Sequence, residues 1–241
     1  MIGHSNNSRA FLTARWSNLG LITYAVEAAV LKPELPRGCE LDMRDGLAFV
    51  SLVVFDFLDT RVKGCRVPRH VNFPEINLRY YVRCKGLRGV SFIREFVPRR
   101  MIAWVARRIY NEPYIATPMQ SRIGCDGDHC ETAHRFWFAG TWHEVRVRGL
   151  RPPVVPSAGS IDHFFKEHNW GFGKSRDGAL RQYRVEHPAW AVYPDAAAEV
   201  RVDFAAVYGE KWAFLSAAVP HAVTFAVGSE VTVYPWTDQK A

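Results

Sequence analysis

The segment Phe73-Pro-Glu-Ile-Asn-Leu-Arg-Tyr-Tyr-Val-Arg-Cys84 decides the fold. Apolar and polar side chains alternate along it, and a period of two predicts a β-strand with two different faces. One face is apolar and consists of Ile76, Leu78, Tyr80 and Val82. The other face carries a polar row made of Glu75, Asn77, Arg79 and Tyr81.

The neighbouring segments predict partners for this strand. Lys85-Gly86 is a turn signal, and residues 89–96 return as the second strand of a hairpin. Residues 47–58 are almost continuously apolar, which predicts a strand buried on both faces. Further strands are expected at residues 19–26, 114–123, 132–147, 179–185, 189–193, 223–227 and 231–234.

Helices are few and short in this pattern. Pro98 precedes a segment in which Ile102, Val105 and Ile109 recur at helical spacing. Shorter helices are expected at residues 27–32 and 161–168. Because strands dominate, we predict an α+β fold of mostly antiparallel strands, a barrel or sandwich with a few flanking helices. We expect one domain over residues 1–241, with residues 1–12 as a loose N-terminal tail.

Composition restricts the class of protein. The chain is 48% hydrophobic, which is enough for a packed core, and no apolar run reaches the roughly 18–20 residues of a membrane span. No apolar leader begins the chain, so a cytoplasmic protein without a membrane partner is expected. The five cysteines are odd in number and loosely spaced, which predicts free thiols in a reducing compartment. No cysteine or histidine spacing indicates a metal site, and no cofactor motif is present.

The net charge of +7 raises the question of an anionic partner. The basic residues are scattered, so nucleic acid is the less favoured partner. The one concentration of charge is the expected helix at residues 99–108, with Arg99, Arg100, Arg107 and Arg108. A binding or scaffold module, nucleic-acid-associated through this helix, is the alternative function.

The polar row on residues 75–81 is the best candidate for chemistry. A carboxylate, an amide and a guanidinium on one strand face suit a small polar ligand, and a guanidinium binds a carboxylate through two parallel hydrogen bonds. The ordinary alternative is a solvent-exposed face, which is the commonest reason for such a row. Spacing alone does not decide between the two.

Several motifs, in order along residues 16–195, resemble the YqjF-like family (domain of unknown function 2071) of the acetoacetate decarboxylase-like superfamily. The matching pieces are Trp16-Ser-Asn-Leu, Leu35-Pro-x-Gly38 with Asp42 and Gly46, Val50-Ser-Leu-Val53 with Phe55, residues 73–82, Gly86-x-x-Gly89-Val-x-Phe92, Ala106-Arg107-x-x-Tyr110 with Pro113-Tyr114, and His187-Pro-x-Trp190. The resemblance implies a closed β-barrel around an internal cavity, with helices outside. It favours a pocket over an exposed face for the polar row. Relatives in the superfamily form homo-oligomers, so an oligomer stays open for this chain.

The resemblance also compares this chain with the decarboxylase site, whose lysine forms a Schiff base with a keto acid. Arg107 and Pro113 keep the family separation, but Tyr114 stands where that lysine is expected and Ile115 where its neighbouring lysine is expected. The family glutamate at Glu75 is kept. A second glutamate aligns with Ser51. A phenol forms no imine, so Schiff-base decarboxylation is not expected.

These comparisons predict a pocket for a small carbonyl- or carboxylate-bearing molecule. Any reaction would be lyase- or isomerase-like proton transfer without an imine, and whether a reaction occurs is left open. The resemblance assigns catalysis to Glu75 and Tyr114, and ligand binding to Asn77, Arg79, Ser51 and Arg107.

Overall fold

The computed structural model describes residues 9–166, 168–175 and 178–239. The fold is α+β with mostly antiparallel strands and few helices, as predicted. The helical segments are α1 (Ala28–Leu31), η1 (Lys32–Glu34), α2 (Arg100–Ile109), α3 (Ile161–Lys166), α4 (Phe204–Tyr208) and η2 (Glu210–Ser216). None of the described helices is both long enough and apolar enough to cross a membrane.

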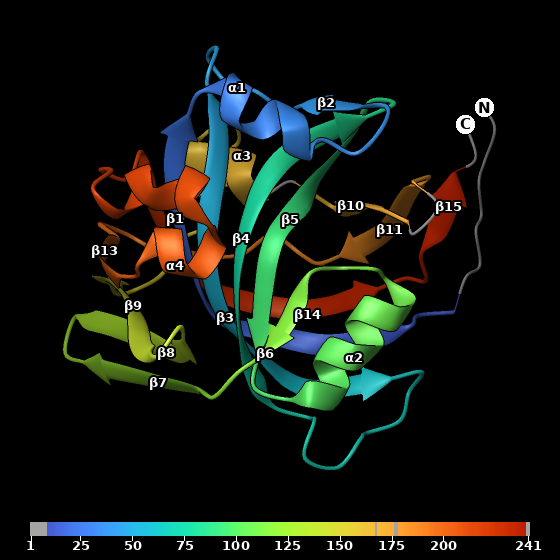
Figure 1. Cartoon of the computed structure of the whole chain (residues 1–241). Coiled ribbons are helices and arrows are strands. Elements are labelled where there is room, and N and C mark those ends of the chain that lie inside the picture. The colour runs from blue at the N-terminus through green and yellow to red at the C-terminus, as the bar shows by residue number, and fades with distance from the viewer. Residues whose placement is uncertain (1–8, 167, 176–177, 240–241) are drawn as a thin grey trace.

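One large sheet forms the body of the molecule (Figure 1). It contains β1 (Leu12–Val26), β2 (Cys39–Leu41), β3 (Ala48–Val62), β4 (Phe73–Cys84), β5 (Leu87–Val97), β6 (Tyr114–Ala116), β10 (Trp170–Lys174), β11 (Leu180–Glu186), β12 (Val192–Tyr193), β14 (Ala222–Val233) and β15 (Thr237–Gln239). The hydrogen-bonded path β14-β1-β3-β4-β5-β10-β11 returns to β14 through the pairs Val185–Val233 and Glu186–Thr232.

A second sheet has the order β13-β9-β8-β7 and consists of β7 (Met119–Asp126), β8 (His129–Phe138), β9 (Thr141–Leu150) and β13 (Ala197–Arg201). The single strand predicted over residues 132–147 is wrong, because the chain reverses at Ala139-Gly140. Both residues have positive φ, 48° and 82°, as a tight hairpin turn requires.

Strand β3 is buried on both faces, as its apolar run predicts. Leu52 and Val54 pack into a core on one side of the main sheet, and Val53 and Phe55 into a core on the other. Because alternate residues of a strand point to opposite faces, an almost continuously apolar run fits a strand between two cores.

The β4–β5 hairpin contains an irregularity that matters for the site. Its turn at Lys85-Gly86 has positive φ at both residues, 50° and 80°. From the turn the strands pair regularly to Arg79, which lies opposite Phe92, but Leu78 lies opposite Arg94. The extra residue on β5 is a β-bulge, and it changes which β5 side chains share a face with the polar row.

The N-terminal prediction needs a correction. Residues 1–8 of the expected tail lie outside the described residues, but the chain after them is not loose. Leu12 begins β1 and pairs with Val233, and the Phe11 N–H donates to the Val233 carbonyl oxygen at 2.9 Å.

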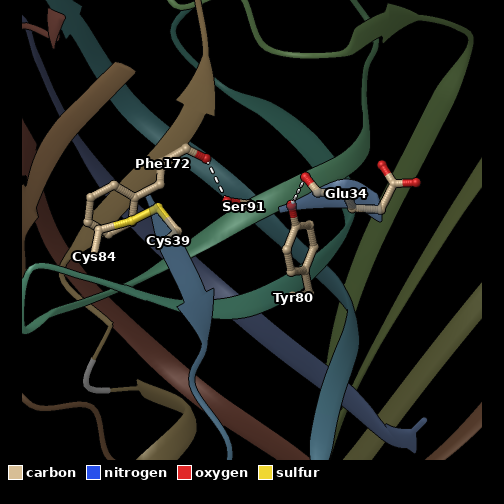
Figure 2. Close-up of a disulfide and its surroundings, with 6 residues drawn as sticks. All are labelled: Glu34, Cys39, Tyr80, Cys84, Ser91 and Phe172. Carbon is tan, nitrogen blue, oxygen red and sulfur yellow. Dashed lines mark hydrogen bonds between the residues drawn. A yellow bond between two sulfur atoms is a disulfide. The ribbon is translucent and has the colours of Figure 1, made fainter. Parts of the chain in front are cut away.

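The prediction of free thiols is wrong for four of the five cysteines. Cys39 and Cys84 form a disulfide between β2 and β4, close to the hydrogen bonds that Tyr80 and Ser91 donate to backbone carbonyls (Figure 2). Cys125 and Cys130 form a second disulfide. Each pair lies directly opposite in an antiparallel ladder, which sequence spacing does not reveal. Four paired cysteines do not indicate a reducing compartment, and the cytoplasmic location stays a prediction.

Thiol counting tests these pairs. Cys65 is the exposed free cysteine. We expect iodoacetamide to modify one cysteine per denatured, unreduced chain and all five after reduction. Peptide mass mapping identifies the modified residue. Labelling of Cys39 or Cys125 without reductant would contradict the assigned disulfides.

Candidate functional site

A cavity of about 430 Å³ lies against the β4–β5 part of the main sheet. Such a volume is in the range of small-molecule sites. Most of its wall is apolar and aromatic, including Trp16, Phe55, Phe57, Phe73, Phe92 and Trp190. Polar side chains are confined to a minority of the wall, so the cavity suits a mainly apolar molecule with a polar group.

The polar row of β4 turns inward. Glu75, Asn77 and Arg79 all line the cavity, and the first two are 3% and 2% exposed. Tyr81 continues the row but does not line the cavity; the guanidinium carbon of Arg79 lies 5.7 Å from its ring centroid. An exposed strand face, the alternative interpretation of this row, is excluded.

Strand register assembles the polar end of the cavity. Asn77 on β4 lies opposite Glu95 on β5, and Glu95 lies beside Tyr114 on β6. These three side chains therefore form a row across three strands, and Glu75 lies two residues before Asn77 on β4. The bulge in β5 makes this possible, because uninterrupted pairing from the turn would put Arg94 opposite Asn77.

Hydrogen bonds join the predicted catalytic pair. The Tyr114 hydroxyl donates to Glu75 Oε2 at 3.0 Å, and Asn77 Nδ2 donates to Glu75 Oε1 at 3.0 Å. Glu95 lies close enough to Glu75 for each carboxyl group to influence the pKa of the other. Glu75 is thus held by an amide and a phenol, with a second carboxyl group nearby.

Burial raises the pKa values of the three glutamates in the cavity toward neutral pH. It raises the pKa of Glu75 to about 7, against the hydrogen bonds from Asn77 and Tyr114, which lower it. Burial and the nearby Glu112 and Glu75 carboxyl groups raise the pKa of Glu95 well above its usual value. Burial also raises the pKa of Glu112 to about 8. At neutral pH these three glutamates therefore retain protons that exposed carboxyl groups would have lost.

The pKa of Tyr114 is raised, whereas an activated phenol has a lowered pKa. Burial, followed by the charges of Glu75 and Glu95, raises its pKa well above the usual value. Its hydroxyl therefore stays protonated and acts as a hydrogen-bond donor. A general-acid role for Tyr114 requires a lowered pKa, and this surrounding does not supply one.

At another part of the cavity wall His168 pairs with Asp42, and no role for this pair was predicted from the sequence. His168 lines the cavity, and its Nε2 lies 2.9 Å from Asp42 Oδ2. Burial lowers the pKa of His168 to about 4, so the ring is neutral. Burial would raise the pKa of Asp42, but hydrogen bonds from His168 and Arg88 outweigh it and lower that pKa to about 2. Asp42 belongs to a family motif, which was the only available signal.

Several buried polar atoms on the cavity wall have no hydrogen-bond partner among the described residues. They are Trp16 Nε1, Thr60 Oγ1, Asn77 Oδ1, Arg79 Nε, Glu95 Oε1 and His168 Nδ1. A buried polar group without a partner costs about 1–3 kcal/mol, so a cluster of them on one cavity calls for an explanation. Partners supplied by a bound molecule are one such explanation.

Two other predicted ligand residues lie outside the cavity wall. Ser51 is fully buried between Thr23 and Tyr81, whose hydroxyl oxygens lie 2.7 and 2.6 Å from its own. Arg107 is exposed on α2, and its Nε donates to the Ala103 carbonyl oxygen one turn earlier. No group of three or more histidine, cysteine or acidic side chains among the described residues is arranged to hold a metal ion.

Sequence comparisons place this chain among proteins of one uncharacterized family. The DUF2071 family model, "Uncharacterized conserved protein (COG2071)", matches residues 13–230. A curated relative, "Uncharacterized protein YqjF" of Bacillus subtilis, is 25% identical over 189 residues, 78% of this chain and 77% of the relative.

Solved structures of the acetoacetate decarboxylase-like type are similar in fold. The acetoacetate decarboxylase of Legionella pneumophila has a TM-score of 0.63 at 13% identity, covering 100% of this chain and 92% of that one. The enduracididine biosynthesis enzyme MppR has a TM-score of 0.65 at 10% identity, covering 99% of this chain and 91% of that one. At these identities the likeness concerns the fold alone.

Proposed function

Because the chain belongs to the DUF2071 family of uncharacterized conserved proteins, whose name assigns no activity, we propose its function from the cavity: it binds a small, mainly apolar carbonyl compound and exchanges a proton at the carbon beside that carbonyl. The observation that carries the proposal is the buried Glu75, hydrogen-bonded to Tyr114 and close to Glu95, at the polar end of an apolar cavity.

The carboxyl groups favour a carbonyl over a carboxylate. Glu75, Glu95 and Glu112 line the cavity together, and Arg79 is the only arginine that does so among the described residues. A ligand carboxylate would add negative charge to this group. A neutral carbonyl oxygen instead accepts hydrogen bonds from the Arg79 Nε–H or from a protonated carboxyl group.

The proposed step is proton abstraction. The Glu75 carboxylate removes a proton from the α-carbon, and electrons move onto the carbonyl oxygen, which is stabilised by hydrogen bonds. Return of a proton to the same carbon completes an exchange; return to a different atom gives an isomer. A base with a pKa near 7 is suited to this work at neutral pH.

Isotope exchange tests this step directly. We expect the protein in D2O to speed the loss of the α-proton NMR signals of 4-phenylbutan-2-one, a ketone with an apolar body. Glu75→Gln is expected to slow the catalysed exchange by about 100-fold or more, the usual range for a general base. Glu230→Gln on an exposed part of β14 is the matched control and should exchange like the wild type. Equal exchange by Glu75→Gln and the wild type would refute the proposed base.

The proposal includes the absence of imine chemistry, which is supported by the lack of lysine among the described residues that line the cavity. Borohydride treatment in the presence of acetoacetate should therefore leave the mass of the protein unchanged. A covalent adduct on any lysine would contradict this part of the proposal.

A further inference from the structure

The exposure of three lining residues indicates that the cavity opens between segments that are far apart in the sequence. Phe11 precedes β1, Val67 lies in the loop between β3 and β4, and Met101 lies on α2; all three line the cavity. These side chains are partly or largely exposed, whereas Glu75 and Glu95 are buried. Figure 1 shows α2 and the β3–β4 loop at the same end of the sheet. We call this surface the rim of the cavity.

The rim is strongly basic. Its exposed cations lie at the end of β3, in the β3–β4 loop, and on α2 with the residue before it: Arg61, Lys63, Arg69, Arg99, Arg100, Arg107 and Arg108. None of them forms an ion pair with a described residue. Arg66 in the same loop pairs with Asp59. Within α2 there is no acidic residue. The rim therefore presents unpaired positive charge around an apolar opening.

Helix α2 also exposes apolar side chains. Trp104 is 61% exposed and Met101 is 45% exposed. Arg100, Trp104 and Arg108 recur at a spacing of four, so the indole lies on the same helix face as the arginines. Ile102 and Val105, by contrast, line the cavity. One helix thus joins an outward basic and aromatic face to the cavity wall.

We propose that this rim docks on the surface of an anionic phospholipid bilayer, with Trp104 among the headgroups, and that an apolar ligand passes between the bilayer and the cavity. Arginines suit anionic headgroups, and tryptophan prefers the membrane interface. The sequence-based expectation of no membrane partner rested on the lack of a spanning segment, and surface docking needs none. The rim suits a bilayer surface because its basic side chains match anionic headgroups and its apolar side chains surround an apolar opening.

A charge-matched comparison tests the docking. Sedimentation with vesicles of 3:1 phosphatidylcholine and phosphatidylglycerol should capture the protein in 50 mM NaCl, and pure phosphatidylcholine should not. The triple variant Arg100→Gln/Arg107→Gln/Arg108→Gln should partition about 100-fold more weakly, since each lost cation near the surface weakens binding roughly fivefold. Trp104→Ala should also weaken partitioning.

The control is Arg37→Gln/Arg122→Gln/Arg148→Gln, which removes the same charge from exposed positions away from α2. It should bind at least ten times more strongly than the α2 triple variant. Circular dichroism establishes that each variant is folded. Equal losses in both triple variants, or no capture by anionic vesicles, would overturn the proposal. Binding to single-stranded RNA that depends on α2, without vesicle binding, would overturn it in favour of nucleic acid.

Failure of the docking is distinguishable from failure of the proposed proton exchange. Vesicle binding is measured without a ketone, and Glu75→Gln should bind vesicles like the wild type. Exchange with 4-phenylbutan-2-one is measured without vesicles.

Discussion

Asp42→Ala is expected to lower the free energy of unfolding by about 3 kcal/mol at pH 7. The Asp42 side chain is 1% exposed, and it accepts hydrogen bonds from Arg83 at 2.8 Å, Arg88 at 2.6 Å and His168 at 2.9 Å. Removing one partner of a buried charged group costs about 3–5 kcal/mol. The lower end applies, because Arg83 and Arg88 are 45% and 31% exposed and regain water. Urea denaturation measures the difference.

The pH dependence of this effect follows from the lowered pKa of Asp42. The carboxylate stabilises the fold above its unfolded pKa of 3.8, and this contribution is lost as the pH falls through about 2. The wild type and Asp42→Ala should therefore converge in acid. Glu199→Ala, which breaks an exposed pair with Arg201, should cost no more than about 1 kcal/mol. A loss as small for Asp42→Ala would show that the buried cluster stabilises the fold no more than an exposed ion pair does.

Glu75→Gln is expected to stabilise the protein at pH 8 by up to about 3 kcal/mol while removing the proposed base. The pKa of Glu75 is raised by burial from 4.5 to about 7, so the folded state holds its proton more tightly than the unfolded state does. Ionisation then favours unfolding progressively as the pH rises from 4.5 to 7. A difference of about 2.5 between the two pKa values corresponds to about 3 kcal/mol. Glutamine does not ionise and avoids this cost.

The comparison is made by urea denaturation at pH 4 and pH 8. The gain at pH 8 should disappear at pH 4, where the folded and unfolded states both carry the proton. Glu230→Gln, at an exposed position, should show no such pH-dependent gain. If Glu75→Gln were less stable than the wild type at pH 8, the carboxylate would be a stabilising ion in the folded protein, and its assignment as a base with a pKa near 7 would be wrong.

Local patterns in the chain predicted much of the fold. The alternation over residues 75–82 predicted β4 and its two faces, and the apolar run at 47–58 predicted a strand between two cores. The Lys85-Gly86 signal predicted the hairpin. The family motifs further brought Glu75 and Tyr114 into one site, and the structure joins them by a hydrogen bond.

Other features depend on contacts between distant residues. The polar row faces a cavity rather than solvent because other elements cover that side of β4, and alternation contains no information about what covers a face. The Cys39–Cys84 disulfide and the Asp42–His168 pair likewise join residues that register and packing bring together, 45 and 126 positions apart.

The β4–β5 hairpin shows most clearly which features follow from local sequence and which depend on tertiary structure. Sequence determined the two strands, the turn and the inward or outward alternation along each. Pairing continued regularly from that turn points Arg94 toward the cavity and Glu95 away from it. The bulge near Ile93 reverses this assignment, and only the tertiary structure decided it. One unpaired residue moves every later side chain to the opposite face, and nothing in the local sequence marks where that residue falls.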